Sequence, residues 1–290
     1  KLAARDVMDE SEALALFRSR SETVDDVRWT TSDVALLDDA FDVLGPKPGR
    51  GGKLEESDEI RTFGHIVIDE VQDLTPMQLK MATRRSLNGS MTIVGDIAQA
   101  TGPLAPDSWD DVLAHLPDRK QPRVIGLSVG YRIPGQIMDL ANRVAEAATP
   151  GLRAPVSVRV GEAGPTVVRA AAGADLGRTV SAEVVTMQTA IPGASLGVVA
   201  PDSLLPDLSE ALSAAGINHG TATRTGLDAG VTLVAVSVVK GLELDGVIVV
   251  EPSRIVSDIE HGMRALYVAL TRSTQRLTVV HADQLPASMR

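Results

Sequence analysis

Two acidic strand ends are the first residues in this sequence whose types and spacing point to chemistry. The run HIVIDE, residues 65–70, closes on Asp69 and Glu70, and MTIVGD, residues 91–96, closes on Asp96. Ligands of open α/β sheets bind at the carboxyl edge of the strands, where such carboxylates would lie. One carboxylate can hold Mg²⁺, and its neighbour can orient or deprotonate an attacking water. A bare Asp-Glu pair can also simply start a solvated loop, and the second acidic strand end weighs against that interpretation.

Uncharged and cationic side chains stand at the next predicted element boundaries. Gln99 follows Asp96 by three residues and can hydrogen-bond a phosphate oxygen or a water. Tyr131 and Arg132 lie between a predicted strand and a predicted helix. An arginine there can stabilise charge on a transferring phosphoryl group, or it can face solvent.

The C-terminal part of the chain carries two further charged motifs. Lys240, Gly241 and Glu243 belong to a KGLE sequence between two apolar runs. They must reach an edge or an interface of the sheet, or else form a plain turn. Arg272 follows the predicted helix RALYVAL, where it could act in chemistry or only complement the helix dipole.

Short apolar runs that alternate with helical patterns are the elements that must position these residues. The predicted strands lie at 65–70, 91–96, 123–129, 166–170, 195–200, 231–236, 246–251 and 275–281. The predicted helices lie at 76–87, from about 108, and at 134–148, 176–191, 203–215 and 260–270. Strands followed by helices in this order predict an α/β fold with parallel sheets covered on both faces.

The charge balance changes near the middle of the chain. Residues 1–120 hold 14 basic and 23 acidic residues, a net charge of −9, whereas residues 121–290 hold 14 and 15, a net charge of −1. The change coincides with a break between two strand-helix series near Pro122. We therefore predict one domain over residues 1–122 and a second over residues 123–290.

The first domain is expected to begin with an acidic helical segment. Two helices are predicted between Asp9 and Leu44, with N-caps such as Thr31. The run GPKPGRGGK, residues 45–53, is rich in glycine and proline and is predicted to be a loop.

The composition argues against several classes of protein. The 290 residues carry 28 Lys and Arg against 38 Asp and Glu, a net charge of −10, and only 3 Phe, 2 Tyr and 2 Trp. A protein that coats nucleic acid normally has a basic face and stacking aromatic rings. The absence of cysteine excludes disulfides and thiolate metal sites, and the five histidines show no zinc-binding spacing, so no zinc is expected.

No targeting or membrane signal is found in the sequence. No apolar run approaches the roughly 18 residues that a membrane span needs, and KLAARDVMDE resembles neither a signal nor a transit peptide. A soluble, cytoplasmic protein without membrane contact is expected, and the N-terminus is interpreted as a cut end.

The order of the motifs carries a resemblance to a known family. DExQD, GDxxQ, YR, KGLE and YVALTR follow one another as in the C-terminal half of superfamily 1 helicase motors of the UvrD/Rep type, over residues 65–281. Within this family, the sequence is most similar to the HelD branch, which binds and recycles bacterial RNA polymerase. The segments that carry this similarity are VIDEVQDLTPMQ, GDIAQATGP, VSVVKGLELDGVIVVEP and ALYVALTRSTQRLTVVH. The resemblance implies a P-loop NTPase fold of two RecA-like lobes with ATP between them. Residues 1–122 would be part of the first lobe and residues 123–290 the complete second lobe.

The resemblance also implies a role for each acidic or amide residue of the first lobe. Asp69 would bind Mg²⁺, and Glu70 would be the base for the hydrolytic water. Asp96 and Gln99 would sense the γ-phosphate of ATP.

In the second lobe, the resemblance implies the remaining contacts to ATP. Tyr131 would stack on adenine, and Arg132 and Arg272 would be arginine fingers. Gly241 would approach the γ-phosphate, and Glu243 would bind the ribose. The nucleotide-binding set is therefore Tyr131, Asp96, Lys240, Gly241 and Glu243.

One part of the ATP site is missing from the sequence. A motor of this type needs a GxxxxGK[ST] loop to cradle the phosphates, and the nearest run, PGRGGKL at 48–54, has Leu54 after Lys53. We expect the polypeptide to be a C-terminal fragment that is inactive alone, with the phosphate loop upstream.

The residues that would contact DNA are also missing. Trp109 is the sole ring in ATGPLAPDSW, the run that follows the GDxxQ segment, and core packing is its favoured interpretation. The run VAVSVV precedes Lys240 without the usual Thr and His. Contact with DNA is expected to be weak or indirect. An RNA polymerase remodeller is therefore favoured, and a DNA-repair helicase or a non-catalytic binding module are the alternatives.

Overall fold

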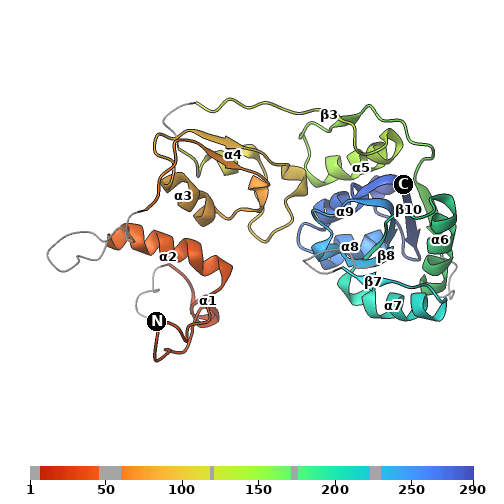
Figure 1. Cartoon of the computed structure of the whole chain (residues 1–290), viewed down its shortest axis with the longest axis horizontal. Coiled ribbons are helices and arrows are strands. Elements are labelled where there is room, and N and C mark those ends of the chain that lie inside the picture. Colours follow the sequence, from red (N-terminus) through yellow and green to blue (C-terminus); the bar gives the residue numbers. More distant parts are fainter. Residues whose placement is uncertain (1–6, 46–59, 118–120, 171–175, 223–229) are drawn as a thin grey trace. The chain divides into compact units, whose positions relative to one another are not determined.

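A computed structural model of the chain separates into two compact units, Lys1–Arg61 and Thr62–Arg290 (Figure 1). The structure describes residues 7–45, 60–117, 121–170, 176–222 and 230–290. The predicted loop at 45–53 lies outside these residues except for Gly45, as does the run at 48–54. The boundary expected near residue 122 falls within the second unit and stays a prediction.

In the described part of the first unit, two helices form the regular structure. They are α1 (Glu10–Ala15) and α2 (Thr31–Leu44), as the sequence predicts. The N-cap of α2 is Thr30 rather than Thr31. The carboxylate of Asp33 accepts hydrogen bonds from the backbone N–H of Thr30 at 2.6 Å and from its hydroxyl at 2.7 Å, which closes the first turn.

A six-stranded parallel sheet forms the core of the second unit, in the order β5-β10-β9-β6-β8-β7. Its strands are β5 (Thr166–Arg169), β6 (Leu196–Ala200), β7 (Gly220–Thr221), β8 (Val231–Ala235), β9 (Leu244–Val250) and β10 (Ser273–His281). All of them except β7 were predicted, with ends that agree to within two residues. The predicted α/β fold with a parallel sheet is therefore confirmed.

Helices cover both faces of this sheet, as a parallel sheet requires. They are α5 (Gly135–Ala148), α6 (Leu176–Ala190), α7 (Leu205–Ala214), α8 (Pro252–Asp258) and α9 (Gly262–Leu270). Of these, α5, α8 and α9 share one hydrophobic cluster, and α6 and α7 share the other. Among the described residues, no helix has the length and hydropathy that crossing a bilayer needs.

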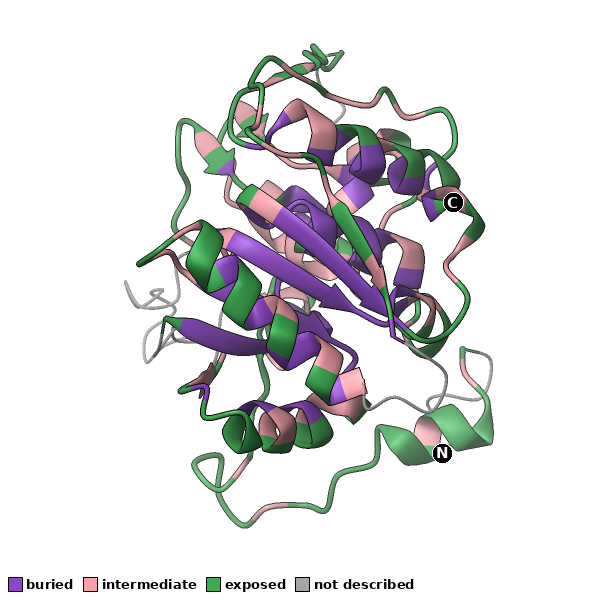
Figure 2. Cartoon of the chain, turned by 90° about the vertical axis from the view of Figure 1, so that its right-hand side faces the viewer, coloured by how far each residue is buried: buried purple, intermediate pink, exposed green. Residues whose placement is uncertain are grey.

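The alternation of side chains along the strands explains the two clusters. In β9, Val247 and Val249 join the cluster of α9, whereas Ile248 and Val250 join the cluster of α6 and α7. Figure 2 shows the central strands as buried along their length. The central strands β6, β8 and β9 are therefore apolar along almost their whole length, which is why they are continuous apolar runs in the sequence.

A second, smaller parallel sheet pairs β1 (Ile66–Ile68) with β2 (Met91–Ile93). Two helices, α3 (Pro76–Arg84) and α4 (Trp109–Leu113), accompany it. Trp109 packs against the small core of this region, which agrees with the favoured interpretation of this ring.

The strand predicted at 123–129 is wrong. The strand β3 contains only Val129–Gly130, which pairs with β4 (Val156–Ser157). Ile125 and Leu127 are 65% and 86% exposed. An apolar run becomes a buried strand only where a neighbouring strand pairs with it, and the described residues supply no such neighbour here. The helix α8 and the strands β4 and β7 were not predicted.

Candidate functional site

The acidic end of β1 is held in an uncommon backbone conformation. Asp69 and Glu70 follow the strand directly, and both are exposed. Glu70 has φ of 51°, in the left-handed region, and its backbone N–H donates to Asp69 Oδ1 at 2.9 Å. Non-glycine residues keep this left-handed conformation only where the surrounding structure holds them in it, and such residues concentrate at functional sites.

Gln72 joins the ends of β1 and β2. Its side chain is 2% exposed, and its Nε2 donates to Glu70 Oε2 at 2.5 Å. Its Oε1 accepts from the backbone N–H of Asp96 at 3.0 Å. A Cβ at Gly95 would lie 2.4 Å from that same Oε1, so a glycine is needed beside it. Gln72 is the glutamine of the DExQD motif, but no role for it was predicted from the sequence.

Gln99 connects the β2 turn with a residue 173 positions later. Asp96 Oδ2 accepts from Gln99 Nε2 at 2.8 Å, and Gln99 Oε1 accepts from Arg272 Nη2 at 3.1 Å. The short 3₁₀ helix η4 (Ile97–Gln99), capped by Asp96 Oδ1 on the N–H of Ala98, fixes this turn. Asp96, Gln99 and Arg272, all predicted site residues, are therefore brought together.

Arg272 is a buried cation at the end of α9. It is 5% exposed, and its Nε donates to the carbonyl of Val268 at 3.0 Å. Burial lowers the pKa of Arg272 from its ordinary value, and the nearby cation Arg132 adds to this effect, whereas Glu243 and Glu70 oppose it. Arg272 thus both caps the helix end and contacts Gln99, so the dipole interpretation alone is incomplete.

The other side of the site is open to solvent. Arg132 Nη1 donates to Glu243 Oε1, and these side chains are 45% and 57% exposed. Tyr131 is 81% exposed. The structure therefore brings Arg132 close to Glu243 and leaves the ring of Tyr131 available.

The KGLE sequence forms a turn that contacts the β1–β2 region. Lys240 Nζ donates to the carboxylate of Asp73 and to the carbonyl of Gln99, the latter at 2.9 Å. Gly241 has φ of +81°, and a Cβ there would meet nothing within 4 Å, so the backbone conformation alone requires glycine. Lys240 is engaged within the protein rather than free to meet a phosphate. The motif therefore forms a turn and also reaches an interface, so the two expected alternatives are both found.

Comparison with known proteins identifies the family that this last segment resembles. Residues 230–280 match the family model of the UvrD-like helicase C-terminal domain. The match contains the KGLE turn and Arg272, the residues that reach across to the β1–β2 region. A search of curated proteins finds no match to the chain.

Two solved helicase structures show a distant likeness to the chain. One is the C-terminal domain of a possible DNA helicase from Lactobacillus plantarum WCFS1, with 22% identity and a TM-score of 0.43, covering 55% of this chain and 92% of that chain. The other is arterivirus nonstructural protein 10, a helicase, with 17% identity and a TM-score of 0.42, covering 89% of this chain and 53% of that chain.

A tyrosine of the UvrD-like segment also belongs to the site. Tyr267 is 3% exposed, and burial together with the negative charge of Asp96 raises its pKa above the ordinary value. Its hydroxyl therefore stays neutral at physiological pH. Tyr267 is the tyrosine of the YVALTR motif, but no role for it was predicted from the sequence.

The residues at the end of β1 fit a magnesium ion that is shared with phosphates. Asp69 offers one exposed carboxylate, and Mg²⁺ is usually bound through one or two carboxylates plus substrate phosphates and water. In the part of the chain that the structure describes, no group of three or more acidic or histidine side chains could hold a metal. The donor set therefore suits an ion that arrives with a nucleotide.

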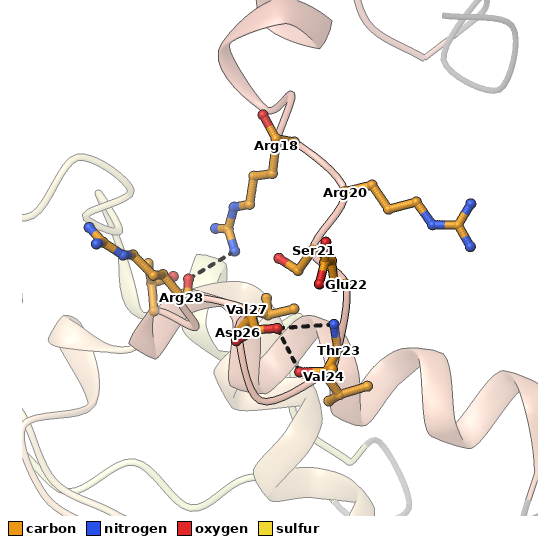
Figure 3. A pocket seen from close by; sticks show the side chains of 11 residues that line it. Arg18, Arg20, Ser21, Glu22, Thr23, Val24, Asp26, Val27 and Arg28 are labelled. Atoms are coloured by element: carbon orange, nitrogen blue, oxygen red, sulfur yellow. Dashed lines mark hydrogen bonds between the residues drawn. The ribbon is translucent and has the colours of Figure 1, made fainter.

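A cavity of about 770 Å³ in the first unit is lined by residues between Arg18 and Thr30 (Figure 3). The guanidinium of Arg18 is bound by both carboxylate oxygens of Asp33 at 3.0 Å. In Figure 3 the side chains of Arg20 and Arg28 point in opposite directions. The cations of this cavity do not converge on one point, so it is not a candidate anion site.

Proposed function

We propose that the intact protein hydrolyses ATP as a motor of the superfamily 1 helicase type, with Mg²⁺ as cofactor. The observation that carries this proposal is the hydrogen bond from Arg272 to Gln99. It joins the turn after the second acidic strand to the end of α9, which lies in the segment with the UvrD-like match.

Glu70 would accept the proton of the attacking water. Its Oε2 already accepts from Gln72, which leaves Oε1 for the water. Asp69 would hold the magnesium ion, which neutralises developing charge on the phosphates when it is bound. Gln72 would link the position of Glu70 to the backbone of Asp96, so that the two strand ends move together.

Two arginines would stabilise the transferred phosphoryl group. Arg272 would leave Gln99, and Arg132 would leave Glu243, when the γ-phosphate offers a stronger acceptor. A buried, preorganised cation interacts strongly with developing charge, because little water competes for it. Arg272 therefore suits the finger role better than the more exposed Arg132.

The open side would bind the nucleoside. Tyr131, at 81% exposure, would stack on adenine, and Glu243 would accept hydrogen bonds from the ribose once Arg132 is withdrawn. Gly241 would let the KGLE turn approach the γ-phosphate, and Lys240 would hold that turn on Asp73.

The proposed partner is bacterial RNA polymerase, in the manner of HelD proteins. The motif wording and the charge of −10 with only seven aromatic residues support this choice. An acidic chain gains little from the phosphate backbone of DNA, which supplies much of the affinity of DNA-binding proteins. Any contact with DNA would therefore be weak or indirect.

The test of hydrolysis is the ATPase rate of the full-length protein and of its Glu70→Gln variant. Loss of the general base is expected to lower kcat by roughly 10²- to 10⁴-fold. Glu210→Gln, an exposed carboxylate on α7, is the matched control and should behave as the wild type. A wild-type protein without ATPase activity, or a Glu70→Gln variant with the wild-type rate, would contradict the proposal.

The partner is tested by adding single-stranded DNA or RNA polymerase to the same protein. Co-purification with polymerase and little stimulation of the ATPase by DNA are expected. Stimulation of many-fold by DNA would instead support a DNA translocase. Polymerase release that is unaltered by Glu70→Gln would support a non-catalytic binding module.

A further inference from the structure

A buried arginine of α9 binds the loop that follows Gln99. Arg264 is 5% exposed, and its Nη1 donates to the carbonyl of Pro106 at 3.1 Å and to that of Ala100 at 3.5 Å. Its Nη2 donates to Asp107 Oδ1 at 2.7 Å. None of these contacts belongs to the ATP chemistry proposed above.

The three acceptors lie at both ends of one loop. Ala100 ends the η4 turn, and Pro106 and Asp107 precede Ser108, which caps α4. One guanidinium therefore closes the loop of residues 100–107 against α9. Because the group is planar with donors in fixed directions, it can hold several acceptors in one arrangement, which a lysine ammonium does not.

Because Arg264 is buried, its hydrogen bonds determine whether the loop of residues 100–107 stays closed on α9. The side chain of Asp107, its carboxylate partner, is 82% exposed, so the cation is buried and the anion is not. A buried charge without its partners is strongly unfavourable. The loop must therefore stay closed on α9 for Arg264 to remain buried.

The same helix also carries the arginine that contacts Gln99. Arg264 and Arg272 are eight residues apart, at the beginning and just beyond the end of α9. Ala100, which Arg264 binds, directly follows Gln99, which Arg272 binds. The helix α9 and its C-terminal end therefore bind the Gln99 turn through two arginines, of which Arg264 is remote from the proposed phosphate position.

We propose that Arg264 is a positioning residue that fixes residues 100–107 on α9 and thereby sets Gln99 against Arg272. This inference rests on the proposed ATPase function and adds a residue to it. Loss of Arg264 leaves Arg272, Gln99 and the acidic strand ends chemically intact and displaces them relative to one another.

The test compares kcat and KM for ATP in the full-length wild type and in three variants. A displacement of about 1 Å costs roughly 10²-fold in rate, so Arg264→Gln should lower kcat to that extent and leave KM nearly unchanged. Arg264→Lys should recover only part of the rate. Arg254→Gln, which breaks the exposed Arg254–Asp283 pair in the same unit, is the matched control and should keep the wild-type rate.

A double variant separates positioning from general loss of structure. If Arg264 acts through Gln99, Arg264→Gln should lower kcat little further in a protein that already carries Gln99→Ala. If the double variant instead loses kcat by the product of the two single-variant losses, the proposal is overturned. Should Arg264→Gln fail to fold, Asp107→Asn replaces it, because this variant removes only the exposed carboxylate. It should show a smaller loss of kcat with the same dependence on Gln99.

The outcomes distinguish this inference from the function on which it rests. A wild type without ATPase activity would overturn both. A wild type and a Glu70→Gln variant that behave as proposed, together with an Arg264→Gln variant as active as Arg254→Gln, would overturn the role of Arg264 alone.

Discussion

The two sides of the candidate ATP site differ in how firmly their residues are held. On the side of the acidic strand ends, Gln72 and Arg272 are buried and hydrogen-bonded to residues far away in the sequence. On the other side, Tyr131, Arg132 and Glu243 are exposed. Groups that stabilise a transition state gain from being preorganised, whereas groups that admit a nucleoside must be reachable. We infer that the buried side, which contains Gln72 and Arg272, holds the exposed Glu70 in place for chemistry, whereas Tyr131 and Glu243 on the exposed side act in binding.

Removal of the buried arginine should have the largest effect. Arg272→Ala in the full-length protein is expected to lower kcat by at least about 10³-fold, the range for arginine fingers. Steady-state ATPase assays measure this, with Arg276→Ala, a partly exposed arginine of β10, as control. A fall in kcat of less than tenfold would contradict the proposed difference between the two sides of the site.

Crowding the buried side should reduce stability. Gly95→Ala places a methyl group 2.4 Å from Gln72 Oε1, and overpacking of this kind costs about 1–3 kcal/mol. Urea unfolding of the chain measures the loss. Gly102→Ala, where a Cβ would meet nothing within 4 Å, is the control, and equal stability of the two variants would show that the Gln72 contact is not tight.

Changes on the exposed side should affect binding rather than rate. Stacking on a base contributes about 1–3 kcal/mol, so Tyr131→Ala should raise the KM for ATP by roughly tenfold with kcat nearly unchanged. Tyr131→Phe keeps the ring and should match the wild type. A fall in kcat with constant KM would place Tyr131 in the chemistry and contradict the division.

A half-buried carboxylate of the first unit tests whether a group near the protein surface can be firmly held. Hydrogen bonds from Thr30 and the neighbouring Arg18 lower the pKa of Asp33 to about 2 from an ordinary 3.8. The contribution of Asp33 to α2 should be complete above pH 3.8 and be lost as the pH falls toward 2. NMR titration of the carboxyl carbon measures this, and Thr30→Ala should raise the pKa. An unshifted pKa in the wild type would show that these hydrogen bonds do not hold the carboxylate of Asp33 firmly.

The sequence predicts the large sheet better than the site contacts. Strands such as β6 and β9 are buried on both faces, so their apolar runs are unambiguous. The run at 123–129 is also rich in apolar residues, but among the described residues only Val129 at its end pairs with another strand, which composition alone does not reveal. The motif residues were identifiable from residue type and order. The partners of Gln72 and Arg264 were not, because 24 and 157 residues separate Asp96 and Asp107 from them.

The most direct test is hydrogen–deuterium exchange of the full-length protein with and without Mg²⁺ and a slowly hydrolysed ATP analogue. We expect slower exchange at 69–73 and 95–99 together with slower exchange at 240–243 and at the end of α9. These segments contribute to one site in the proposal, so they should respond at the same nucleotide concentration. Protection confined to one of the two groups, or no protection at all, would contradict a single ATP site built from both.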